Sequence, residues 1–231
     1  MKKISIALLG AAAVWLAACS DATYESHTTR FYPLEDSQGK IFYADQVHDT
    51  TTVISYDPWT AQTDVDWLTV SPASWTPGPL YASQRMDINA TVNTTGENRM
   101  GRIQVQGYDN IGLTVRQTKW LNVILPYGQG ENDDDDDFSN DEQVFTDLLS
   151  AGAQSYTVRF RNYQDGARLS SEADWISVPD TLPSGYPAGL HDVEITVGAN
   201  TADSVRTGRI VLTSAGVSTP ISFTQLAPKE E

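Results

Sequence analysis

The chain has 231 residues, a formal net charge of −15 and a single cysteine. The acidic balance argues against nucleic acid as a partner, because that affinity depends on Lys and Arg neutralising phosphates. It also argues against adsorption of the protein body onto anionic lipid headgroups. With one cysteine the chain can form no intrachain disulfide, so each domain must be stabilised by its own hydrophobic core.

The first residues have the layout of an export signal. Residues 1–3 are Met-Lys-Lys, residues 4–16 are apolar, and a Leu-Ala-Ala-Cys sequence ends at Cys19. The apolar run is too short for a spanning helix with conventional flanks. A cysteine at the cleavage position resembles the lipobox of bacterial lipoproteins, and an ordinary signal peptide with an incidental cysteine is the alternative. The resemblance implies lipidation of Cys19, with anchoring at the outer membrane or cell surface.

The mature chain would begin with a polar tether and continue into short strands. Removal of residues 1–18 takes away two lysines, so the formal charge moves from −15 to −17. The alternating segment Thr51–Tyr56 is typical of a strand that Asp57-Pro58 terminates. The other strands predicted in the first half are 41–43, 65–70, 86–92 and a hairpin of 102–106 with 111–117.

The middle of the chain interrupts this pattern with five consecutive aspartates, 133–137. Like charges repel and resist packing, so residues 120–140 are predicted to be a solvated acidic linker. Calcium binding is the alternative, because hard cations prefer clustered carboxylate oxygens. The run has neither the spacing nor the distal Glu of an EF-hand, so no metal or cofactor is expected. The weak calcium candidates are Asp133, Asp135 and Asp137.

Strands are also expected in the second half. Residues 141–150 have the composition of a short helix, but their Val144-Phe145 end could equally begin a strand. The strands predicted after this segment are 156–160, the segment around Trp175, 193–197, 209–213 and 221–225.

One pattern occurs twice. Trp67 and Gln117 are 50 positions apart, and so are Trp175 and Gln225. Such self-similarity indicates a duplicated structural unit. Between these ends each copy has an Asn, then Arg-x-Gly-Arg-Ile: Asn93, Arg99, Gly101, Arg102 and Ile103 in the first, and Asn200, Arg206, Gly208, Arg209 and Ile210 in the second.

Many short strands without a sustained helical period predict an all-β fold, with two tandem immunoglobulin-like antiparallel β-sandwich domains. The two tryptophans, Trp67 and Trp175, are expected between the sheets, and Gly101 and Gly208 at close backbone approaches. The predicted organisation is a signal peptide at 1–18, a tether at 19–38, a first sandwich at 39–119, the acidic linker at 120–140 and a second sandwich at 141–228.

The duplicated pattern resembles the BACON domain (Bacteroidetes-associated carbohydrate-binding often N-terminal). The likeness covers about residues 51–118 and 155–226. It implies an immunoglobulin-like sandwich on a lipoprotein exposed to glycans, with carbohydrate binding as the family's proposed role and a spacer role for some members. The units differ where the first has Trp59 and the second has Ala167, which weakens any function shared through that aromatic.

A catalytic site is not expected. Carboxylate pairs such as Asp64/Asp66 and Glu172/Asp174 could imitate a glycosidase dyad, but they flank the tryptophan strands of a small sandwich without an evident cleft. No histidine recurs between the units, and no Cys or His spacing suits a metal. The chain is therefore predicted not to be an enzyme.

Binding is the better-supported function. Sugar rings dock their apolar faces on exposed aromatic side chains, and Pro-stiffened loops can hold such side chains in place. The candidates for carbohydrate binding are Trp75 and Tyr81 in the first Pro/Gly loop and Tyr186 in the second. Rings exposed on one face would favour a glycan-contacting, non-catalytic envelope module, whereas buried rings would favour a structural spacer or protein-interaction module.

The expected partners follow from the predicted lipid anchor and from the two alternative binding functions. They are a glycan or mucin-like polysaccharide, or an envelope protein, with membrane contact through the lipid anchor only and no nucleic acid.

Overall fold

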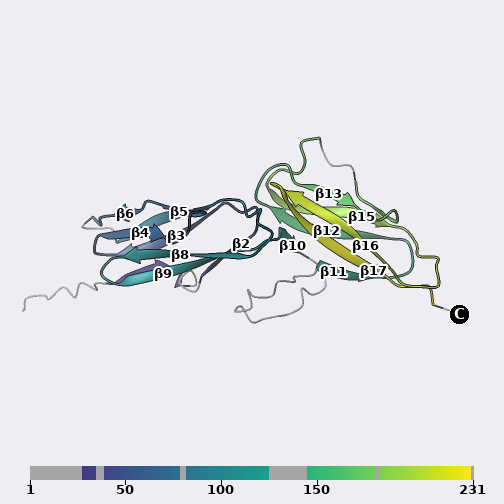
Figure 1. Cartoon of the computed structure of the whole chain (residues 1–231), viewed down its shortest axis with the longest axis horizontal. Helices are drawn as coiled ribbons and strands as arrows, with labels where there is room; N and C mark the ends of the chain where they lie inside the picture. Colours follow the sequence, from purple (N-terminus) through teal and green to yellow (C-terminus); the bar gives the residue numbers. More distant parts are fainter. Residues whose placement is uncertain (1–27, 35–38, 79–81, 125–144, 180–182, 230–231) are drawn as a thin grey trace, which may run out of the picture.

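Two β-sandwiches follow one another along the chain (Figure 1). The computed structural model describes residues 28–34, 39–78, 82–124, 145–179 and 183–229. Strands dominate these residues, as predicted, and none of their helices is long and apolar enough to cross a bilayer. The signal peptide and the five-aspartate run lie outside the described residues.

The first sandwich consists of a four-stranded and a five-stranded sheet. One sheet has the order β1-β3-β7-β5, with bounds Thr29–Tyr32, His48–Ser55, Ser83–Ala90 and Leu68–Ser71. The other has the order β2-β9-β8-β4-β6, with bounds Lys40–Phe42, Asn110–Gln117, Arg99–Gln106, Trp59–Thr63 and Ser74–Trp75.

The second sandwich repeats this plan with two four-stranded sheets. One has the order β10-β12-β15-β14, with bounds Asn122–Ile124, Gln154–Asn162, Gly189–Val197 and Ile176–Ser177. The other has the order β11-β17-β16-β13, with bounds Phe145–Leu149, Val217–Gln225, Arg206–Ser214 and Arg168–Ser171. Pairings among the named strands are antiparallel except β2 with β9 and β11 with β17, which are parallel.

Each sandwich begins earlier in the chain than the sequence pattern indicates. The predicted tether includes β1, which pairs with β3 and buries Phe31 at 2% exposure. The predicted linker includes β10, which pairs with β12 and buries Val123. Both strands are too short to give a clear alternation, and they are fixed by their partners instead. The segment 141–150 contributes strand β11 rather than a helix.

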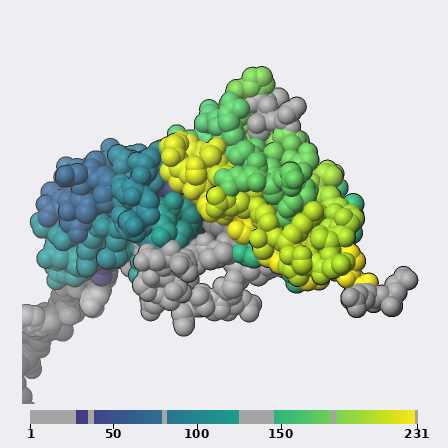
Figure 2. Space-filling model, turned by 45° about the vertical axis from the view of Figure 1, so that its right-hand side comes forward, coloured from purple at the N-terminus to yellow at the C-terminus, as the bar shows by residue number. Residues whose placement is uncertain are grey.

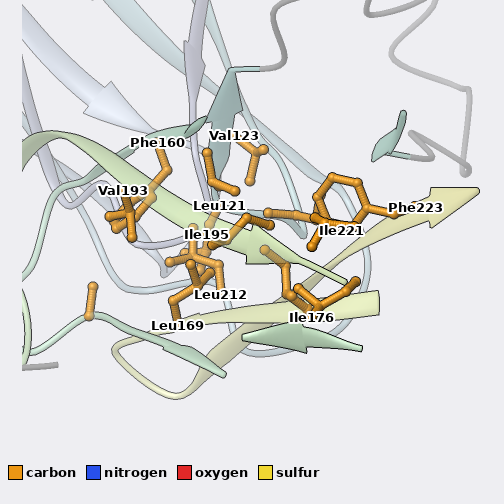
Figure 3. Packing of buried hydrophobic residues seen from close by; sticks show 14 of the residues in the cluster. Leu121, Val123, Phe160, Leu169, Ile176, Val193, Ile195, Leu212, Ile221 and Phe223 are labelled. Carbon is orange, nitrogen blue, oxygen red and sulfur yellow. The ribbon is translucent and has the colours of Figure 1, made fainter. Parts of the chain in front are cut away.

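The two cores exchange large and small residues at equivalent positions. In the first, Trp59 is buried beside Trp75, with ring centroids 6.5 Å apart. In the second, Ala167 takes the place of Trp59, and the ring of Phe160 stands at the position of Val53. Figure 3 shows Phe160 beside Val123 of β10 in this core. Exchanges that keep the total volume are the ones a close-packed interior tolerates.

The duplicated tryptophans lie at the margin of each core rather than fully inside it. Trp67 and Trp175 come just before β5 and β14 and are half-buried. The guanidinium groups of Arg99 and Arg206 lie over their rings, each 4.4 Å from the ring centroid. Among the described residues, Trp59 is the tryptophan that is fully buried. Trp67 and Trp175 were expected between the sheets, and the structure corrects this: they pack on the core from its margin.

The same arginines bind the glutamine that ends each repeat. Nε of Arg99 donates to Oε1 of Gln117 at 2.8 Å, and Arg206 donates to Gln225 at the same distance. The amide nitrogen of each glutamine donates to backbone carbonyls of neighbouring loops. Burial lowers the pKa of Arg99. The duplicated Trp, Arg and Gln therefore form one clamp in each sandwich, named here the Trp–Arg–Gln clamp.

The sandwiches meet at a packed junction. Asp45 is fully buried, and its Oδ2 accepts hydrogen bonds from the backbone N–H of Tyr163 at 3.0 Å and from Ser214 Oγ at 2.7 Å. The rings of Tyr43 and Tyr163 stack with centroids 6.1 Å apart. Leu121 is also buried here. In Figure 2 the β16–β17 hairpin reaches the surface of the first sandwich.

Gly208 tests the packing of the clamp. A Cβ at this position would lie 2.5 Å from Cζ2 of Trp175, so we expect Gly208→Ala to lower the free energy of unfolding by about 1–3 kcal/mol. Gly152→Ala is the control, because nothing lies within 4 Å of the Cβ it would add. Urea unfolding of both variants measures the difference, and equal stabilities would contradict this packing.

Asp45 gives the junction a pH dependence. Burial raises the pKa of its carboxyl above 3.8, so the native state resists ionisation more than the unfolded state does. The stabilising contribution is complete below about pH 4 and is lost as the pH rises through the raised pKa. Relative to Asp45→Asn, the native chain should therefore lose stability in urea unfolding as the pH rises above about 4. Parallel curves for the two proteins would show that Asp45 ionises without penalty.

Candidate functional site

The predicted carbohydrate-binding residues occupy equivalent places in the two units. Trp75 pairs with Trp59 in β4, and Tyr186 forms an isolated bridge with Ala167, the counterpart of Trp59. Tyr81 lies outside the described residues.

Both described rings pack on their own cores. Trp75 is half-buried against Trp59. Tyr186 is half-buried against Phe160, at 5.5 Å between centroids, and burial raises its pKa. The two rings belong to separate sandwiches and separate cores, so they do not form a shared platform. Trp75 still helps to form the end of the first sandwich that lies away from the second.

Two tyrosines that the sequence analysis did not single out are exposed at that end, named here the free end. Tyr56 follows β3 and is 59% exposed, and Tyr108 lies in the β8–β9 turn and is 61% exposed. Both flank the start of β1, since Thr29 Oγ1 lies 3.1 Å from Ser55 Oγ and the backbone N–H of Thr29 donates to Asp109 Oδ2 at 3.1 Å. Figure 1 shows β6, which carries Trp75, at this end.

An amide-lined hollow lies on the outer face of β8 and β9, and two of its residues, Gln106 and Asn110, flank the turn that carries Tyr108. Its volume is about 180 Å³, and Gln104, Gln106 and Asn110 line it together with Arg102. The guanidinium of Arg102 lies across Gly112, which has no side chain to displace it. Amide and guanidinium groups can donate to hydroxyl oxygens, and the amides can also accept. The free end thus combines exposed rings with hydrogen-bonding groups.

The corresponding end of the second sandwich is closed. Tyr163 is the counterpart of Tyr56 in the strand register, and it stacks on Tyr43 of the first sandwich. Ser214 in the β16–β17 turn binds Asp45. The junction therefore covers in the second unit the surface that the first unit exposes.

Sequence patterns gave weak signals for these residues. Tyr56 ends an alternating strand before Asp57-Pro58, and Tyr108 belongs to the turn Gly107–Asn110. An aromatic residue in a turn is a usable sign, because turns lie on the surface. Which turns share one end of a sandwich depends on strand order, which the sequence did not supply.

One member of each acidic pair has a bonding partner in the sandwich. Oδ1 of Asp64 accepts a hydrogen bond from the backbone N–H of Arg102 at 2.7 Å, and Glu172 forms an ion pair with Arg209. Within the described residues no three His, Cys, Asp or Glu side chains could hold a metal ion. The calcium candidates Asp133, Asp135 and Asp137, and the lipidation candidate Cys19, lie outside the described residues.

A family comparison agrees with the duplicated architecture. The model of the BACON family, described as "Putative binding domain, N-terminal", matches residues 57–118 and 167–226, just over half of the chain. The chain belongs to the BACON family. The two matches begin at β4 and at the neighbourhood of β13 and end after β9 and β17, so each BACON unit contains one Trp–Arg–Gln clamp. No curated protein matches the chain.

The solved structures that the chain matches include an enzyme and a chaperone. A Bacteroides ovatus xyloglucanase in complex with a heptasaccharide has 19% identity and a TM-score of 0.35, covering 39% of this chain and 19% of its own. A Bacteroides thetaiotaomicron protein has 13% identity and a TM-score of 0.26, covering 37% and 79%. The E. coli chaperone DraB has 10% identity and a TM-score of 0.33, covering 85% and 95%. Similarities this low do not bear on function.

Proposed function

We propose that this BACON protein is a non-catalytic, lipid-anchored envelope module that contacts glycans through the free end of its first sandwich. The observation that carries the proposal is the exposure of Tyr56 and Tyr108 at one end, next to the hollow lined by Gln104, Gln106 and Asn110. Aromatic rings offer large, rigid contact area at low entropy cost, and nearby amides suit hydroxyl groups. The family description as a binding domain supports the same reading.

The net negative charge of the chain favours neutral glycans over anionic ones. With a net charge of −15, the protein repels uronic-acid-rich or sulfated chains at long range. Asp57 and Asp109 add carboxylates beside the two tyrosines. We therefore infer a neutral glycan as the ligand, held by ring stacking and by hydrogen bonds rather than by ion pairs.

Attachment through Cys19 would hold the sandwiches at the envelope. The lipobox resemblance supports export and anchoring at the outer membrane or cell surface. Asp64 accepts a hydrogen bond from the backbone N–H of Arg102, and Glu172 is paired with the guanidinium of Arg209; both partners support a role without catalysis.

The second candidate function is that of a structural spacer. The packed junction favours it, because Asp45, the Tyr43–Tyr163 stack and buried Leu121 fix one sandwich on the other. A buried contact between two domains limits their relative motion, which suits display of a partner away from the membrane.

Substitution of the exposed tyrosines tests glycan contact. Tyr56→Ala and Tyr108→Ala should each weaken binding to a retained neutral polysaccharide about two- to tenfold, since an aromatic contact contributes about 0.5–1.5 kcal/mol. Affinity gel electrophoresis across a panel of neutral plant and host polysaccharides provides the measurement. Tyr32→Ala is the control, because Tyr32 is 58% exposed but lies at the other end of β1. If no polysaccharide of the panel retards the native chain, glycan contact is contradicted and the spacer function is favoured.

A further inference from the structure

A trough crosses the outer face of the second sandwich, away from the free end. Its volume is about 730 Å³, within the range of sites that hold small ligands. It extends over β11, β17 and β16 and is bordered by the loop 172–175. Four hydroxyl side chains line it, and they belong to Thr146, Thr207, Ser222 and Thr224.

The trough is open because its side chains are smaller than their counterparts in the first unit. Thr207 faces Thr224 across β16 and β17, one step from the clamp residues Arg206 and Gln225. The corresponding pair in the first unit, next to Arg99 and Gln117 in the β8–β9 ladder, is Met100 opposite Arg116. Met100 stands out from the sheet with 62% exposure.

A residue that borders the trough is also smaller than its counterpart in the first unit. Ala173 stands before Trp175 at a position where the first unit has Val65, next to Trp67. Cγ2 of Val65 would lie 2.4 Å from a Cβ on Gly101, so its side chain covers that glycine. The Cβ of Ala173 would lie 2.7 Å from a Cβ on Gly208, so the shorter side chain also covers its glycine but extends no further along the border of the trough. The opening therefore depends on Thr207 and Thr224, which replace Met100 and Arg116 on the face of the sheet.

The chemistry of the trough fits a polyhydroxylated ligand. Among the described residues the four hydroxyls have no hydrogen-bond partner, so each can both donate and accept. Arg209 is paired with Glu172, and Asp174 adds a further carboxylate. Because the one guanidinium is already neutralised, an anionic ligand would meet net negative charge.

We propose that this trough is a second binding site, and that it takes a segment of a neutral oligosaccharide. The ligand lies along β16 and β17, with its hydroxyl groups bound by Thr207, Ser222 and Thr224 and its edge against the ion pair of Arg209 and Glu172. The site is separate from the free end and shares with the proposed function only the class of ligand. It depends on the side chains in which the two units differ, not on the clamp they share.

The test fills the trough with the residues of the first unit. The full chain carrying Thr207→Met and Thr224→Arg is titrated with cellohexaose, xylohexaose and mannohexaose while backbone amide shifts are followed by NMR. In the native chain, at least one sugar should shift the amides of Thr207, Ser222 and Thr224. The double variant should weaken that binding about tenfold or more, because the long side chains occupy the site. Tyr108→Ala should leave these shifts unchanged.

A second variant keeps the shape of the trough. Thr207→Val with Thr224→Val retains volume but removes two hydroxyls, so it should also weaken binding if the hydroxyls recognise the sugar.

Native shifts confined to Tyr56 and Tyr108 would overturn the trough and leave the free-end proposal standing. Shifts confined to the trough residues would support the trough site and contradict glycan contact at the free end. Native affinity in both double variants, or no shift with any of the sugars, overturns the trough.

Discussion

The contact of one guanidinium with a tryptophan face and a glutamine oxygen holds each sandwich together. Arg99 lies over Trp67 and donates to Gln117, and Arg206 does the same with Trp175 and Gln225. The glutamine nitrogen then donates to loop carbonyls, so side chains 50 positions apart connect both sheets with the loops at one end. A stacked cation contributes about 0.5–2 kcal/mol, and a buried amide oxygen left without its donor costs about 1–3 kcal/mol. The repeated sequence is accounted for by this requirement.

Differences between the units determine what each can bind. The clamp is common to both, whereas one end of the second unit is covered by the junction and the same end of the first is exposed with Tyr56. Conversely, Met100 and Arg116 occupy the outer face of the first unit, where Thr207 and Thr224 leave a trough in the second. One duplicated scaffold therefore presents two different surfaces, and buried Asp45 contributes to the junction between the units that carry them. Selection for binding can act on these surfaces without disturbing either core.

Much of the fold could be predicted from the sequence because its signals are local. Alternation gave the long strands, and the Trp-to-Gln spacing gave the duplication. The sequence did not predict strands whose formation depends on pairing with a neighbouring strand. β1 and β10 have few residues, and they form strands because they pair with β3 and β12. The free end was only partly predictable for the same reason. Trp75 could be named from its Pro/Gly loop, but only the strand order brings Tyr56 and Tyr108 to one end of the sandwich. The packing of Tyr186 on Phe160 occurs beside Ala167, where the first unit has Trp59.

The division between a clamp for folding and unshared side chains for binding can be measured in one paired experiment. Arg99→Ala and Arg206→Ala are compared with the native chain for urea stability and, at low urea, for retention on a neutral polysaccharide gel. We expect each substitution to lower the free energy of unfolding by about 2–4 kcal/mol while the folded fraction keeps native retention. Native stability together with lost retention in either variant would contradict it, because the duplicated arginine would then belong to the binding site.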